Sequence, residues 1–175
     1  MIVLVVLAVA LPGFRLLGAL GVRRFGSWAA SAAHAMAVML VLTASAHFVP
    51  ASVTVMPNHA DLVAMVPPFV PFAGAMVYLT GVLELLGAIG LVITATRWAA
   101  GLGLAALFVL LIPANIYAAV ADVPFAGGEA TPLAQRIPEQ LVYIGVALWV
   151  SRSADRTPAL RALQTVRPRT AVPTR

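Results

Sequence analysis

The sequence contains no cysteine and no lysine, and it has few charged residues of any kind. Of its 175 residues, 62% are apolar and only 10% are charged. The absence of cysteine excludes disulfide bonds, thiolate-bound iron–sulfur clusters and thiolate catalysis by this chain. The polar residues are too few to cover the surface of a soluble domain of this size. The chain must therefore use lipid as its solvent.

Five apolar segments follow one another along the chain. They cover residues 1–22, 28–48, 75–95, 98–121 and 137–151. A helix needs about 20 residues to cross about 30 Å of hydrocarbon, so the middle three segments are long enough by themselves. The fifth is short, and we expect residues before Pro138 to contribute to its span. Pro138 itself predicts that the helix starts at this residue. The predicted fold class is an all-α integral membrane helical bundle.

The first segment differs from the other four. Pro12 and Gly13 interrupt it and Arg15 follows, so we expect a kinked helix with Arg15 extending to the membrane surface. Cleavage as a signal peptide is the alternative, but no basic residue precedes the apolar run, and we expect the segment to be retained. The predicted organisation is an additional helix over 1–24, a four-helix core over 25–151 and an arginine-rich tail over 152–175.

The arginines predict the orientation in the membrane. They separate the first segment from the second and the third from the fourth, and they fill the tail, so alternating spans place all three groups on one side. The positive-inside rule makes that side the cytoplasm, which puts the N-terminus and the loops 49–74 and 122–136 outside. Trp28, Trp98 and Trp149 lie near the same side. This basic excess is typical of membrane topology and does not predict nucleic-acid binding.

The external loop 49–74 is rich in proline, which excludes a long helix or a central strand. Its stretch NHADLVAMV predicts one short helix with Asn58 as N-cap and Asp61 in the first turn, ended by Pro67 and Pro68. Such a helix would lie on the bundle as a lid. A stiff connector without secondary structure is the alternative.

Glu84 is the only charged residue in the stretch YLTGVLELLGAIGLV, residues 78–92. At roughly 13 Å from the outer end of its helix it lies near the bilayer midplane. Small residues share its side of the helix, and bulky ones occupy the opposite side: Leu79, Val82, Leu86, Ile89 and Ile93. Because small residues mark close helix packing, Glu84 is expected to face the interior. A carboxylate there costs about 2.5–3.5 kcal/mol, which selects a buried partner or a protonated acid.

Further polar groups are expected in the external half of the same bundle. Pro113 frees a backbone carbonyl that Asn115 or a neighbouring side chain must help to satisfy. His34 and His47 project to opposite sides of their helix, so they cannot ligate one haem or metal together, and no metal site is predicted. The polar residues converge on one predicted pocket. Its candidate catalytic residues are Glu84 and His47, and its candidate cofactor-binding residues are Asn115, Tyr117, Arg136 and Gln140.

A series of motifs carries a resemblance to a known family. The motifs SAHFVP, MVPPFVPF, YLTGVLELLGAIGLV, the turn at Arg97, IPANIYAA and RIPEQL occur in this order. Over about residues 28–150 they resemble the DoxX / DoxX-like family of small bacterial and archaeal membrane proteins. The resemblance implies a four-helix membrane bundle in the bacterial cytoplasmic (inner) membrane. It also implies that the family's polar positions correspond to His47, Glu84, Asn115, Arg136 and Gln140.

The same resemblance bears on function. Some members of that family are the small subunit of a thiosulfate:quinone oxidoreductase or the membrane partner of redox complexes, and distant eukaryotic relatives act as receptor-assembly chaperones. This sequence departs from the family pattern in two places. Residues 1–22 add a helix before the shared core, and Glu139 stands beside Arg136 where an apolar residue is common.

Two functional interpretations remain open. In the first, the chain is an accessory subunit of a membrane redox complex without its own electron carrier. Its pocket binds a quinone or quinol, with His47 and Glu84 exchanging protons and Asn115 or Tyr117 bonding a carbonyl. In the second, it is a non-enzymatic scaffold or assembly factor that recruits a partner protein or a second copy, and Glu84 is a structural clamp. A proton or solute path along Glu84 ranks last, since no further acids lie in series.

Overall fold

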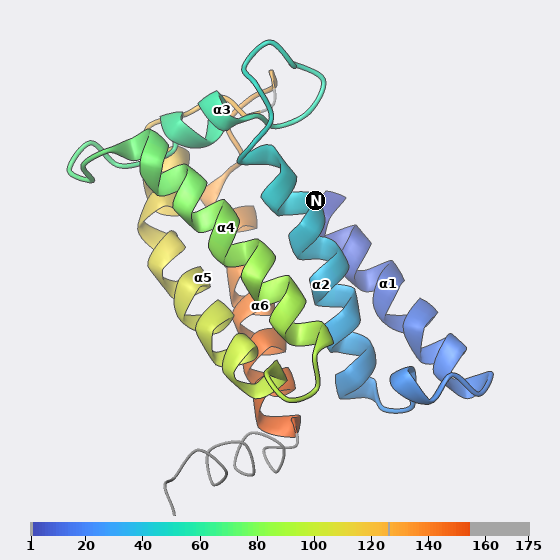
Figure 1. Cartoon of the computed structure of the whole chain (residues 1–175). Helices are drawn as coiled ribbons and strands as arrows, with labels where there is room; N and C mark the ends of the chain where they lie inside the picture. Colours follow the sequence, from blue (N-terminus) through green and yellow to red (C-terminus); the bar gives the residue numbers. More distant parts are fainter. Residues whose placement is uncertain (1, 126, 155–175) are drawn as a thin grey trace, which may run out of the picture.

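The computed structural model describes residues 2–125 and 127–154, which form six α-helices and one 3-10 turn without a strand (Figure 1). The elements are α1 (Ile2–Ala19), η1 (Arg23–Phe25), α2 (Trp28–Ala46), α3 (His59–Ala64), α4 (Ala73–Val92), α5 (Arg97–Val120) and α6 (Leu133–Ser153). The all-α prediction is therefore confirmed. From residue 155 on, the predicted cytoplasmic tail lies outside the described residues.

Four helices, α1, α2, α4 and α5, are long and apolar enough to cross a membrane. Their length and composition indicate a membrane protein. Helix α6 has 21 residues, but it carries Arg136, Glu139 and Arg152 and is not among these four. Helix α1 is continuous through Pro12, and Leu7 is its one buried residue.

Helix α6 begins at Leu133, so the prediction that its helix starts at Pro138 is wrong. The first four N–H groups of any helix lack an intrahelical acceptor, so a proline soon after them removes only one hydrogen bond. The earlier start confirms that this segment borrows length from residues before Pro138. It also places Arg136 inside the helix, on the same face as Gln140 and Tyr143.

Successive long helices run in opposite directions, so the two ends of the bundle differ (Figure 1). Helix α3 lies across one end, which we call the lid end. The other end, which we call the arginine end, carries Arg23 and Arg24, Arg97 and Arg152, as the alternation of the predicted segments required. Helices α2, α4, α5 and α6 form the bundle, and α1 packs against the outside of α2.

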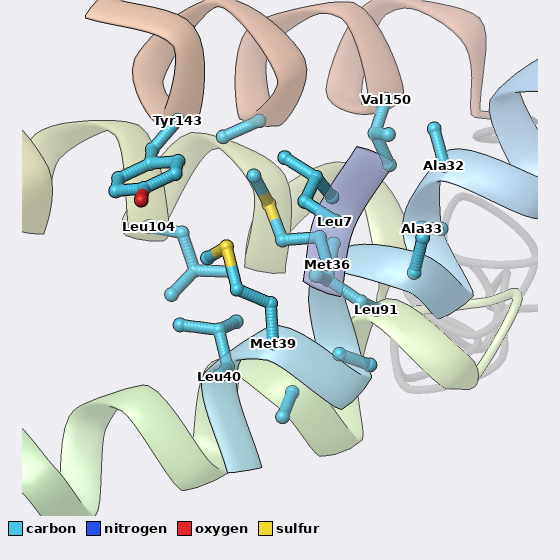
Figure 2. Close-up of a cluster of buried hydrophobic side chains, with 14 of the residues drawn as sticks. Leu7, Ala32, Ala33, Met36, Met39, Leu40, Leu91, Leu104, Tyr143 and Val150 are labelled. Carbon is cyan, nitrogen blue, oxygen red and sulfur yellow. The ribbon is translucent and has the colours of Figure 1, made fainter. Parts of the chain in front are cut away.

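The core is centred on α2, whose buried residues are mostly alanine and methionine. Figure 2 shows Met36, Met39 and Leu40 of α2 packed among side chains from α4, α5 and α6. Glycines allow the other helices to approach closely. A side chain at Gly90 would lie 2.7 Å from the Ala100 side chain of α5, and one at Gly101 would lie 2.7 Å from a carbonyl of α6.

At the arginine end, two arginines satisfy the last carbonyls of α4. Arg97 donates from Nε to the Leu91 carbonyl at 2.7 Å, and Arg24 donates from Nη2 to the Val92 carbonyl at 3.2 Å. Cations are favourable at this end of a helix because its carbonyls lack intrahelical donors. Arg24 also donates from Nε to Nε2 of His34 at 2.8 Å.

Candidate functional site

The lid end is fastened by a short capped helix. The Asn58 side chain accepts from the backbone N–H of Asp61, and the Asp61 carboxylate accepts from the backbone N–H of Asn58. This reciprocal capping box confirms the predicted N-cap and the predicted helix. His59, the first residue of α3, donates from Nδ1 to the backbone carbonyl of His47 at 2.9 Å. Its ring stacks on Tyr78 of α4 with centroids 4.1 Å apart.

Glu84 faces the interior of the bundle, as predicted. It is 5% exposed, and Val77, Ala88 and Leu91 on its side of α4 are also buried. The opposite side is exposed along the whole helix, at Leu79, Val82, Leu86, Ile89 and Ile93. The distribution of small and bulky residues was therefore a sufficient guide to the direction of the acid.

The carboxylate of Glu84 meets two side chains of the second helical segment. Thr43 lies 2.8 Å away, with its hydroxyl donating to Oε2. Nε2 of His47 lies 3.6 Å from Oε1. We call His47 and Glu84 together the His47–Glu84 couple. His47 is 8% exposed and directly follows the end of α2, so the couple joins α2 to α4 near the lid end.

The hydrogen bonds of His47 fix its tautomer. Nδ1 lies 2.6 Å from the carbonyl oxygen of Val77, which can only accept, so Nδ1 carries a proton. The hydroxyl of Thr80 donates to the same carbonyl at 2.9 Å. Nε2 is therefore the nitrogen that changes protonation, and it faces Glu84.

Gly81 makes room for the imidazole. A side chain at this position would lie 2.7 Å from Cγ of His47 and 3.1 Å from its Nδ1. Contacts of this length with a ring are not tolerated without movement of the ring or of the helix. The close approach of α2 and α4 at the couple thus depends on Gly81.

A second polar group lies between α5, α6 and the loops of the lid end. Arg136 donates from Nη1 to Oδ1 of Asn115 at 3.3 Å and from Nε to the carbonyl of Thr131 at 3.0 Å. Nη1 also lies 3.9 Å from the sulfur of Met65, and the guanidinium lies over the ring of Phe125 at 5.6 Å. We call Arg136, Asn115, Met65 and Phe125 the Arg136 group.

Asn115 is already engaged at both ends of its amide. Its Nδ2 donates to the Leu111 carbonyl of its own helix at 3.1 Å, near the Pro113 interruption, while its Oδ1 accepts from Arg136. This arrangement leaves Asn115 as a connector between α5 and α6. Tyr117 is partly buried against the small apolar cluster of Met65, Ala118 and Val123. Gln140 is buried one turn after Arg136 on α6.

The structure therefore brings four of the six candidate residues together in two separate pairs, and in the described part of the chain Tyr117 and Gln140 bond to neither pair. His47 joins Glu84, and Asn115 joins Arg136. Over residues 2–125 and 127–154, no hydrogen bond or ion pair connects the two sets, so the single shared pocket stays a prediction. Thr43 was not among the candidates, although its position one turn before His47 was a usable signal. Met65 and Phe125 lie in loops, where no periodicity indicates direction.

Two hollows lie elsewhere on the surface. One, of about 250 Å³, is an apolar groove between α4 and α5, and the other, of about 490 Å³, lies on α1. Neither is lined by a candidate site residue. In the described part of the chain, no cluster of three potential metal ligands occurs.

A family model matches more than half of the chain. Residues 36–151 match the model of a family described as Domain of unknown function (DUF8561), and the chain belongs to that family. The match covers the helices that carry both polar sets. No curated protein and no solved structure matches the chain.

Proposed function

We propose that this protein is a DoxX-like, multi-pass protein of the bacterial cytoplasmic membrane that serves as an accessory subunit of a membrane redox complex. The observation that carries the proposal is the buried His47–Glu84 couple, with Nε2 of His47 3.6 Å from a carboxylate oxygen. Ionisable residues inside a membrane bundle are by default functional, because their burial is costly. The arginine end faces the cytoplasm in this proposal, and the lid end faces outward.

The proposed substrate class is a quinone or quinol whose headgroup docks at the lid end. Oxidation of a quinol releases two electrons and two protons. The electrons pass to a carrier on a partner subunit, His47 accepts one hydroxyl proton at Nε2, and the carboxylate of Glu84 accepts the other. Thr43 holds the carboxylate in place through its hydroxyl. The headgroup reaches the couple only when α3 moves, because His59 fastens this helix to the end of α2.

A second candidate function is a non-enzymatic scaffold or assembly factor. Its support is that the couple is buried, is bonded to its neighbours and lines neither hollow. In that case Glu84 and Thr43 fix how α2 and α4 pack. Interhelical hydrogen bonds in membranes contribute only about 0.6 kcal/mol on average, but they disfavour wrong arrangements.

Variants at Glu84 separate the two functions. We expect decyl-ubiquinone to bind the wild-type protein in mild detergent, and Glu84→Gln to weaken this binding about tenfold or more because the carboxylate that takes the proton is absent. Glu129→Gln, at an exposed acid, is the matched control and should bind normally. Infrared difference spectra of the carboxyl C=O stretch report whether Glu84 changes protonation on binding.

The opposite result has a defined meaning. Equal quinone binding by wild type and Glu84→Gln would contradict the redox proposal. If the same variant, or Glu84→Leu, also lost a protein that co-purifies with the wild type, mass spectrometry of the eluate would identify the partner and support the scaffold. Glu84→Leu should still insert, since leucine favours the hydrocarbon.

A further inference from the structure

Three buried polar atoms on one face of α6 have no hydrogen-bond partner among the described residues. They are Nη2 of Arg136, Oε1 of Gln140 and the hydroxyl oxygen of Tyr143. The residues are 7%, 8% and 9% exposed, and their spacing of four and three positions places them on successive turns of the same face. Buried polar atoms are nearly always paired, so three orphans on one face point to an absent partner.

The guanidinium of Arg136 makes that partner an anion. In the described residues no carboxylate lies within 4.0 Å of it. Besides the neutral oxygens of Thr131 and Asn115, it contacts the sulfur of Met65 and the ring of Phe125. A thioether and an aromatic ring are weak partners for a desolvated cation. Glu139, one turn further along α6, attracts the guanidinium through space, but Nη2 still has no hydrogen-bond partner among the described residues.

The other two orphans supply uncharged groups beside the cation. The hydroxyl of Tyr143 is a donor, and it lies among buried apolar side chains (Figure 2). The amide of Gln140 presents its NH2 group after a half-turn about its last bond. Together with the planar fork of Arg136, these groups match an acceptor that has several oxygens and a negative charge.

We propose that this face of α6 is a binding site for an oxyanion, of the carboxylate or phosphate class, which enters at the lid end by displacing Met65 and Phe125 from Arg136. Both covering side chains come from the loop regions of the lid end and not from the long helices. Two oxygens of one oxyanion can accept from Nη1 and Nη2 together, which neither the sulfur of Met65 nor the ring of Phe125 can do. The same chemistry is carried by a free anion from the aqueous side and by the phosphate of a lipid headgroup. This site does not depend on the His47–Glu84 couple.

The test uses the full chain purified in an uncharged detergent. We expect inorganic phosphate or acetate to raise the midpoint of thermal unfolding in a saturable way, beyond any effect of the same ionic strength of chloride. Arg136→Gln should weaken the apparent affinity about tenfold or more, since a charge-assisted hydrogen bond is lost. Tyr143→Phe should weaken it severalfold while keeping the ring against Phe108. Arg23→Gln, at the other end, should keep the wild-type affinity.

A second arm identifies the source of the anion. The protein is transferred to nanodiscs of phosphatidylcholine with or without phosphatidylglycerol, and retained lipid is counted by native mass spectrometry. Saturable binding of phosphate or acetate without lipid assigns a free anion. Retention of phosphatidylglycerol that is lost in Tyr143→Phe and Arg136→Gln assigns a lipid headgroup. If neither ligand binds, or if both variants bind as the wild type does, these atoms hold only water and the proposal is overturned.

Discussion

Gly81 and His47 share one small volume between α2 and α4. The imidazole occupies the place where a side chain at residue 81 would extend, and its two nitrogens then reach Val77 on one side and Glu84 on the other. A difference of one methyl group therefore decides whether the couple forms. Gly81, which has no side chain, therefore controls the position of His47 relative to Glu84.

We predict that Gly81→Ala destabilises the protein by about 1–3 kcal/mol, because overpacking of a tight contact forces side chains or backbone to move. Gly103→Ala is the matched control. No atom lies within 4 Å of the position of its added methyl group, so the helix should gain up to about 1 kcal/mol from the better helix former. Reversible unfolding in mixed detergent micelles measures both values. A Gly81→Ala variant as stable as the wild type would mean that α2 and α4 separate at little cost.

The direction of Glu84 could be read from the sequence because a membrane helix sorts bulky and small residues by side. The atoms that contact the Glu84 carboxylate, on Thr43 and His47, could not be predicted from this distribution. Gly87, Gly90 and Gly101 lie against a neighbouring helix, but Gly103 meets nothing within 4 Å. Composition alone does not say which side of α5 a glycine occupies relative to α4 and α6.

At the scale of elements, α3 is the part of the described fold with the least support. It has six residues, none of them buried, and its contacts run mainly to α4. An isolated helix of this length is not stable in water, so its caps and the attachment of His59 matter more than its own backbone bonds. The His59 attachment also joins α3 to the backbone of His47.

We predict that Asn58→Ala loosens α3 by about 1 kcal/mol, because the variant loses the side-chain oxygen that caps the helix. Amide hydrogen exchange in residues 59–65 should rise, while exchange in α4 should not change. Asn58→Asp keeps a capping oxygen and should largely restore protection. Faster exchange in α4 as well would show that the lid and the bundle open together.

The helix boundaries show where sequence reasoning was weaker. The start of α3 could be predicted because its capping residues, Asn58 and Asp61, lie close together in the sequence. Helix α6 begins at Leu133, five residues before Pro138, because a proline in the second turn of a helix is tolerated and does not have to mark its start. Arg136 gains its buried position from that extension, so the second polar set depended on information that is not local.

For the whole molecule, the charges are divided between the two ends. Of the six described arginines, five lie at the arginine end: Arg15, Arg23, Arg24, Arg97 and Arg152. Arg136 lies at the lid end, together with the acids Asp61, Asp122, Glu129 and Glu139. This division was readable from the order of apolar runs and arginines, because adjacent long helices must alternate in direction. The packing of α1 against the outside of α2 could not be predicted from the sequence, because the apolar residues of a helix do not indicate which other helix they contact.

We predict that the lid end faces outward in cells. The chain has no cysteine, so single cysteines report without background. A cysteine at Val55, which is 92% exposed near α3, should react with a membrane-impermeant maleimide in intact cells or spheroplasts. One at Thr94, in the turn between α4 and α5, should react only after lysis. The reverse pattern would contradict the orientation, and reaction at both sites in sealed cells would contradict the span of α4.

The bond between Arg24 and His34 has a consequence for the order of assembly. Ribosomes deliver α1, η1 and α2 before α4 exists, so the carbonyl of Val92 is not yet there to receive Arg24. His34 belongs to the same early hairpin and can accept one donor of that guanidinium from the outset. The arginine is thus partly solvated by its own hairpin during translation, and the arrival of α4 completes its coordination.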